Sequence, residues 1–166
     1  MDEPLATDAS GQALLSFRTA EEHEHAKTSE HPCPLSLVVV RSRGEVLFGL
    51  NRWRHDWELP GGMREVGESA RAAARRELEE ETGVTVTPDT LRWGGRATFD
   101  LVNPRRVELA AVYVADLDER PDIEPSTELV EVQWFSVDAL PTPHSVLDLA
   151  IAREVTRSIL RVGRGE

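Results

Sequence analysis

The chain has 166 residues, and its 19 Lys and Arg face 30 Asp and Glu, which gives a formal net charge of −11. This length fits one domain, and hydrophobic and charged fractions of 40% and 30% predict a globular fold. The acidic balance repels phosphate backbones and disfavours nucleic acid as a general partner, whereas it suits carboxylate sites for divalent cations. The single cysteine, Cys33, cannot form an internal disulfide. The first residues are acidic and lack a basic segment followed by an apolar one, and the longest apolar run is short, so we expect neither a signal peptide nor a membrane span. We therefore expect a cytoplasmic protein without membrane contact.

Residues 1–34 are expected to form an N-terminal extension, because their sequence pattern differs from that of the rest of the chain. The apolar stretch Ala13–Phe17 is expected to add a strand to a sheet edge, either in its own chain or in a second copy, which would make a homodimer. Residues 21–31 have no apolar period and predict a solvated linker. His23 and His25 in this linker resemble metal ligands, but two histidines without further partners favour the linker interpretation.

From residue 35 onward, strands and one helix alternate with turns. Residues 35–41 and 45–50 predict a hairpin, and residues 57–59 predict a short extended segment. Residues 60–62 (Pro-Gly-Gly) predict a tight turn outside regular structure. Ser69 is expected to cap a helix over 70–81, which Gly83 ends.

The second half of the chain is predicted to complete one sheet and add a closing helix. Strands are expected at 84–86, 91–99, 106–117 and 130–135, and an amphipathic helix at 145–160. Strands on either side of a central helix favour an α/β sandwich around a mixed sheet. We assign residues 35–160 to this domain and residues 161–166 to a tail.

The helix over 70–81 carries an unusual group of acids. Glu77, Glu80 and Glu81 stand at i, i+3 and i+4 and share one face, which overlaps the apolar face that includes Leu78. We expect all three carboxylates to point toward the core, where a cation would relieve their repulsion. Oxygen ligands of this kind select a hard ion such as Mg²⁺, with Mn²⁺ as the alternative. An exposed Glu-rich helix is the competing interpretation.

The flanking residues complete a longer pattern. From Gly62 to Val84 the sequence reads Gly-x5-Glu-x7-Arg-Glu-Leu-x-Glu-Glu-x-Gly-Val. This resembles the Nudix box at every specified position, and the preceding residues 57–62 resemble the strand and turn that lead into it. The resemblance covers residues 35 to about 160. It implies a Nudix-type α/β/α sandwich with a central mixed β-sheet.

The resemblance also implies an activity: metal-dependent hydrolysis of the pyrophosphate linkage in a nucleoside diphosphate joined to another moiety. The substrate class includes nucleotides, nucleotide sugars and nucleoside triphosphates, all of them small molecules. It implies metal ligands at Glu77, Glu80 and Glu81, with Glu68 as an additional ligand. Arg76 is expected to orient a glutamate, and Gly61 and Gly62 to leave room for phosphates.

Other roles stay open at the level of sequence. Glu128 is the expected general base, with Glu124 and Glu131 as rivals. Arg52 is a candidate phosphate ligand, and four aromatic residues are candidates for stacking on a base: Trp53, Trp93, Phe99 and Tyr113. For Trp93 and Tyr113, packing in the core is an equal alternative. Two alternative functions are a non-catalytic ligand-sensing regulatory domain and an RNA 5′-end pyrophosphohydrolase.

Overall fold

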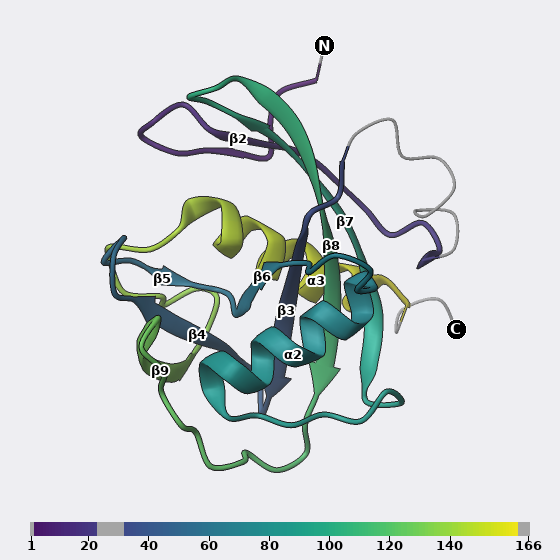
Figure 1. The fold of residues 1–166 in the computed structure, drawn as a ribbon, viewed down its shortest axis with the longest axis vertical. Helices are drawn as coiled ribbons and strands as arrows, with labels where there is room; N and C mark the ends of the chain where they lie inside the picture. Colours follow the sequence, from purple (N-terminus) through teal and green to yellow (C-terminus); the bar gives the residue numbers. More distant parts are fainter. Residues whose placement is uncertain (1, 23–31, 163–166) are drawn as a thin grey trace.

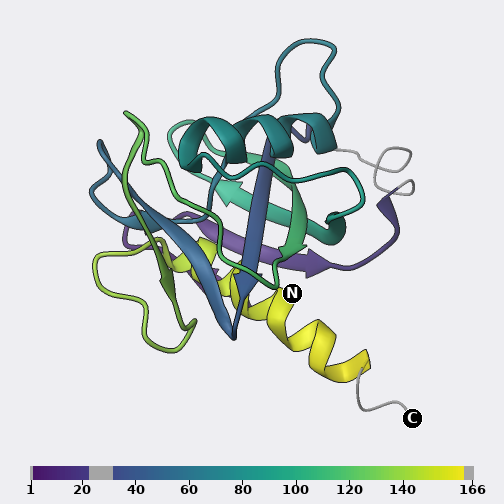
Figure 2. The same cartoon turned by 90° about the horizontal axis from the view of Figure 1, so that it is seen from below.

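The computed structural model describes residues 2–22 and 32–162. A nine-stranded sheet lies at its centre, with helix α2 on one face and helix α3 on the other, as Figure 2 shows from below. The elements in chain order are β1 (Ala6–Thr7), β2 (Ala13–Arg18), β3 (Leu35–Ser42), β4 (Glu45–Asn51), β5 (Trp57–Glu58), β6 (Gly61–Met63), α2 (Ala70–Thr82), β7 (Leu91–Leu101), β8 (Arg106–Asp116), β9 (Leu129–Phe135) and α3 (Val146–Val162) (Figure 1).

The sheet is mixed, as the alternation of elements predicts. Its strand order is β1-β2-β7-β8-β3-β4-β5, with β6 paired to β3 and β9 paired to β4. Strands β3 and β8 are parallel, and all other named pairs are antiparallel. The architecture is the expected α/β sandwich with a central mixed sheet. No helix among the described residues is both long and apolar enough to cross a membrane.

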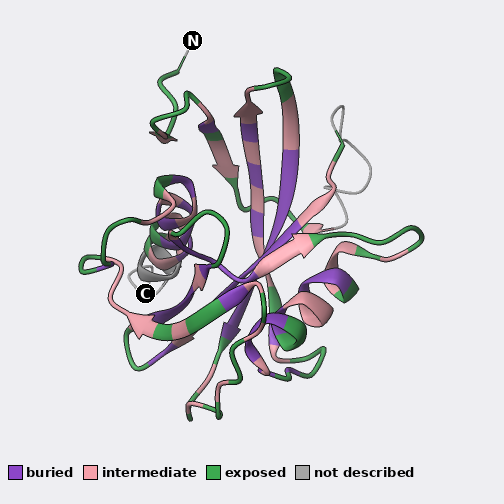
Figure 3. Ribbon diagram, turned by 60° about the vertical axis from the view of Figure 1, so that its left-hand side comes forward, coloured by how far each residue is buried: buried purple, intermediate pink, exposed green. Residues whose placement is uncertain are grey.

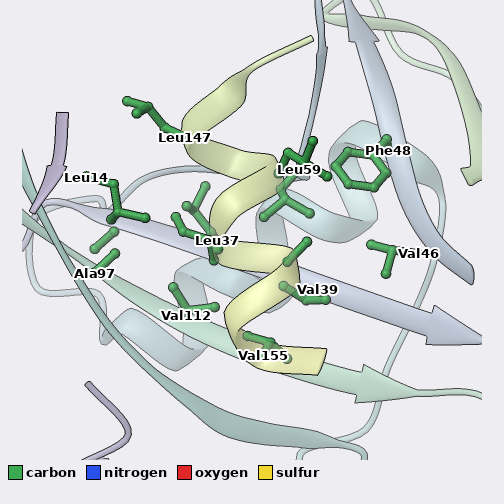
Figure 4. Packing of buried hydrophobic residues seen from close by; sticks show 14 of the residues in the cluster. Leu14, Leu37, Val39, Val46, Phe48, Leu59, Ala97, Val112, Leu147 and Val155 are labelled. Carbon is green, nitrogen blue, oxygen red and sulfur yellow. The ribbon is translucent and has the colours of Figure 1, made fainter. Parts of the chain in front are cut away.

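The central strand β3 explains where the two cores form. Successive side chains of a strand point to opposite faces, so Leu37 and Val39 pack toward α3 while Val38 and Val40 pack toward α2. Figure 4 shows the cluster on the α3 side, and Figure 3 shows that burial continues along the central strands. Because both faces of β3 are covered, its apolar run is continuous rather than alternating.

Local chemistry determines both ends of α2. The Ser69 hydroxyl accepts a hydrogen bond from the Ala72 N–H at 3.1 Å. At the other end, Gly83 adopts φ 74° and its N–H donates to the Glu79 carbonyl. The predicted helix boundaries are therefore confirmed to within one residue. These caps fix the register of the acids that the helix carries.

Two predictions of local structure are wrong. Residues 84–86 form no strand, because Val84 and Val86 bury their side chains against the core on the α2 side instead of joining the sheet. Residues 61–63 are not merely a turn but the strand β6, which pairs with β3. Gly61 makes this pairing sterically feasible, since a Cβ there would lie 2.3 Å from the Ser36 carbonyl oxygen.

The predicted N-terminal strand is present and belongs to its own chain. Strand β2 pairs antiparallel with β7, and the segment after it reaches α2. There the Glu22 carboxylate accepts a hydrogen bond from the Tyr113 hydroxyl and pairs with the Arg71 guanidinium, each at 2.7 Å. Residues 23–31, which include His23 and His25, lie outside the described residues.

Candidate active site

Helix α2 presents its acids to different environments. Glu81 is buried, Glu77 is nearly buried with 14% of its side chain exposed, and Glu80 is exposed, at 60%. The prediction that all three point to the core is therefore wrong for Glu80. The reason is geometric: Glu80 follows the buried Leu78 by two positions and thus lies about 200° around the helix from it.

Arg76 connects the acids at the start of the site. Its guanidinium donates to Glu68 at 2.8 and 2.9 Å, to Glu77 at 2.8 Å and to Glu80 at 3.3 Å. It also donates to the Met63 carbonyl at 3.1 Å, which ties α2 to β6. The same guanidinium lowers the pKa of Glu68 to about 2. These contacts are what a residue that orients glutamates would make.

The two glycines of β6 bring its backbone against the acids. A Cβ on Gly62 would lie 2.4 Å from Cδ of Glu77, so only glycine fits beside the carboxylate in its present position. The Gly61 N–H donates to Oε1 of Glu81 at 3.4 Å. The predicted close approach of this segment to the helix is thus present, through contacts to Glu77 and Glu81.

Glu81 lies where negative charges converge. Its burial, together with the charges of Glu128 and Glu77, raises the pKa of its carboxyl to about 9. Burial also raises the pKa of Glu128, with smaller effects from the charges of Glu58 and Glu77. The charge of Glu128, which comes from the segment just before β9, therefore acts on the two helix acids.

The rivals of Glu128 lie in other surroundings. Glu131 is exposed, and its carboxylate accepts a hydrogen bond from the Gln133 amide at 3.3 Å. Glu124 is also exposed, and its backbone N–H donates to the Thr82 carbonyl at the end of α2. Glu128 is the candidate whose carboxylate interacts with the charges of Glu58 and Glu77.

The donor set fits a hard divalent cation. All its side-chain donors are carboxylate oxygens, which is the chemistry that Mg²⁺ prefers. A buried glutamate with acidic neighbours and a raised pKa is what a bound cation would neutralise. Among the described residues, no three acidic, His or Cys side chains are already gathered as a metal site.

A polar network beside the site was missed at the level of sequence. Asn51 and Glu58 are buried, and the Asn51 amide donates to Glu58 Oε1 at 2.8 Å. The Arg54 guanidinium donates to both oxygens of Glu58, at 2.8 and 3.0 Å. Nearby, Asp148 accepts a hydrogen bond from the Leu59 N–H, and burial with the charge of Glu58 raises its pKa to about 7. The two arginines in the loop over 51–56 indicated that this loop has a charged role. The sequence does not show, however, that Glu58, the partner of Arg54, is buried.

The residues proposed to contact the base or the phosphates fall into two groups: some are exposed beside the site, and others are packed in the core. Arg52 is exposed, and its N–H donates to the Glu128 carbonyl at 2.8 Å, which puts it beside the site. Trp53, next to it, is exposed. Trp93 instead packs edge-on against the buried Tyr113 with ring centroids 5.5 Å apart, and Phe99 lies in the core. Packing is therefore the observed role of these three rings.

Comparisons with known proteins agree with the sequence pattern. The chain is 34% identical over 110 residues to the oxidized purine nucleoside triphosphate hydrolase of Danio rerio, which covers 64% of this chain and 68% of that protein. It is 29% identical to the 8-oxo-(d)GTP phosphatase of Mycolicibacterium smegmatis, over 98% of this chain and 50% of that protein. It is 31% identical to the NAD-capped RNA hydrolase NudC of Haemophilus influenzae, over 81% of this chain and 50% of that protein. The chain thus spans about half the length of the last two relatives.

Solved structures show the same fold. The Bacillus subtilis pyrophosphohydrolase BsRppH superposes with a TM-score of 0.68 at 22% identity, covering 97% of this chain and 98% of that one. A MutT/nudix family protein from Enterococcus faecalis superposes with a TM-score of 0.67 at 19% identity, over 87% and 71% of the two chains. The sequence model of the NUDIX domain matches residues 31–155. The chain therefore belongs to the NUDIX family.

Proposed function

We propose that the chain hydrolyses the diphosphate linkage of nucleoside triphosphates in the cytoplasm, with purine nucleotides oxidised on the base as the first candidate substrates. The observation that carries this proposal is the buried Glu81 with Glu128 and Glu77 near it: burial, together with the charges of these two acids, raises its pKa to about 9. Two relatives that cover much of the chain are named for oxidised purine nucleotides, which supports this choice of substrate.

Each residue of the site has a role in this proposal. Glu77, Glu80 and Glu81 would hold Mg²⁺ or Mn²⁺, with Glu68 as an additional ligand or as the residue that fixes Arg76. The cation supplies charge neutralisation at the phosphates and lowers the pKa of the attacking water. Arg76 holds the Glu77 carboxylate in place through its 2.8 Å hydrogen bond.

We assign Glu128 as the general base, which accepts the proton of the attacking water. A carboxylate with a raised pKa is a stronger base than an ordinary one, and Glu128 faces the helix acids from a separate segment. Gly61 and Gly62 carry no side chain, so their backbone leaves space for the phosphates beside the helix. The products would be a nucleoside monophosphate and pyrophosphate.

A substrate panel tests the proposal. The protein is incubated with Mg²⁺ and with 8-oxo-dGTP, dGTP, ADP-ribose, NAD or RNA carrying a 5′-triphosphate, and monophosphate, pyrophosphate and phosphate are measured. We expect release of pyrophosphate from the triphosphates, and at least a 100-fold lower rate for Glu81→Gln. Glu79→Gln is the matched control, since Glu79 is exposed on the same helix and lies about 200° around it from Glu77 and from Glu81. Full activity in excess EDTA would refute the proposal.

A second candidate substrate is the 5′ end of RNA. The 31% identity to an NAD-capped RNA hydrolase favours it, while the net charge of −11 opposes binding of a polyanion. The RNA and NAD arms of the same panel separate the two candidates.

A further inference from the structure

Trp53 differs from the other tryptophans of the chain. It is 65% exposed, whereas Trp57 is buried, Trp93 packs on Tyr113 and Trp134 lies under the Arg120 guanidinium at 4.6 Å. An indole left in water loses the free energy that its burial would provide. Its position therefore requires an explanation other than packing within the chain.

The turn that carries Trp53 is held firmly. The Asn51 carboxamide oxygen accepts hydrogen bonds from the N–H groups of Trp53 and Arg54, both at 2.9 Å. The amide nitrogen of the same side chain donates to Glu58, which also binds the Arg54 guanidinium. The indole thus belongs to a turn whose backbone is already ordered. Binding of a ligand to it therefore costs little additional conformational entropy of that backbone.

The turn borders the candidate active site. The Arg52 N–H donates to the Glu128 carbonyl at 2.8 Å, and the Glu128 carboxylate is coupled electrostatically to Glu77 and Glu81. Arg52 itself is exposed, and it forms no ion pair within the part of the chain that the structure describes. An exposed cation and an exposed aromatic side chain are therefore consecutive residues of a turn whose backbone is bonded to that of Glu128.

On this basis, and resting on the proposed function, we propose that Trp53 binds the substrate by stacking on its nucleobase. Every nucleobase offers an aromatic face, and stacking on an aromatic side chain contributes to binding largely independently of base identity. Arg52 lies beside it as a partner for the charge of the nucleotide phosphates. Trp53 would then act on binding and leave the chemical step, which the helix acids perform, unchanged.

The test compares Trp53→Ala with Trp53→Phe on a nucleoside triphosphate that the wild-type protein hydrolyses. We expect a KM that is roughly 10-fold higher for the alanine variant, with an unchanged kcat, and recovery of most of the loss by phenylalanine. Product inhibition supplies a second measurement. The inhibition constant of the nucleoside monophosphate should rise in Trp53→Ala, whereas that of pyrophosphate, which has no base, should not.

Leu15→Ala is the matched control, because Leu15 is an exposed apolar side chain on β2 and should leave all these constants unchanged. A wild-type KM in Trp53→Ala would overturn the stacking inference while the proposed hydrolysis stands. Equal increases in the two inhibition constants would also overturn it, since a base contact cannot act on pyrophosphate. A wild-type protein that hydrolyses no nucleotide would instead overturn the proposed function. Tryptophan fluorescence would then decide the stacking on its own: a nucleoside monophosphate should quench it in the wild-type protein and not in Trp53→Ala, and equal quenching in the two proteins would overturn the inference.

Discussion

The variant Gly62→Ala should displace the Glu77 carboxylate, and we expect it to lower the rate of hydrolysis more than the stability of the fold. The backbone of Gly62 is in a region open to other residues, but its new Cβ would lie 2.4 Å from Cδ of Glu77. Carbon atoms in contact are about 3.5 Å apart, so the carboxylate must move by roughly 1 Å. A displacement of this size in a reacting group can cost about 100-fold in rate, which corresponds to about 2.7 kcal/mol of transition-state stabilisation.

The stability cost of Gly62→Ala should be smaller. Moving Glu77 breaks its 2.8 Å hydrogen bond to Arg76, which is worth about 1.5–3 kcal/mol for a charged pair. Replacing glycine returns about 0.4–1 kcal/mol by restricting the unfolded chain. We therefore expect Tm to fall by at most about 8 °C while kcat/KM falls by about two orders of magnitude.

The assay measures kcat/KM with saturating Mg²⁺ beside a thermal melt. Gly44→Ala is the control, because Gly44 has φ +80° and its Cβ would contact nothing within 4 Å. It should lower Tm by a few degrees through backbone strain and leave the rate unchanged. Wild-type turnover in Gly62→Ala would refute the reasoning, since it would mean that the site tolerates a displaced Glu77.

Two further predictions concern the charges of the site. Mg²⁺ or Mn²⁺ should raise Tm with concentration, and the triple variant Glu77→Gln/Glu80→Gln/Glu81→Gln should show a much smaller rise; equal shifts would place the dominant cation site elsewhere. Asp148, whose pKa is raised from 3.8 to about 7, favours folding when protonated, so its contribution is complete below pH 3.8 and is lost as the pH rises through 7. Its partial exposure keeps this effect below the roughly 4 kcal/mol of the full shift. Asp148→Asn should therefore flatten the dependence of unfolding free energy on pH between 4 and 8, as urea titrations at several pH values would show, and an unchanged slope would contradict the assignment.

Sequence reasoning succeeded where local chemistry decides the structure. The ends of α2 follow from a serine cap and a left-handed glycine, both of which act within one turn of the helix. The strands β3 and β4 follow from their apolar runs and the turn between them. The box pattern also identified the residues that meet around Arg76, because most of them share one helix or the loop before it.

Two of the failures depend on contacts between distant segments. Strand β6 forms because the backbone of β3 lies beside two glycines, which no local propensity indicates. The exposure of Glu80, in contrast, follows from its position about 200° around α2 from the buried Leu78. Asn51 and Glu58 read as ordinary loop polar residues, and only the fold shows that both are buried and bonded to each other.

The pairing of β2 with β7 has a consequence for solubility. Strand β7 is eleven residues long, and without β2 its outer edge would present a row of unpaired backbone groups. Strands from other molecules can pair with such an edge. We therefore expect the N-terminal segment to protect the protein from aggregation. A chain beginning at Pro34 should accordingly form higher-order species in size-exclusion chromatography, and it should do so faster as temperature rises. In the intact protein, we expect such association to begin where β2 detaches from β7.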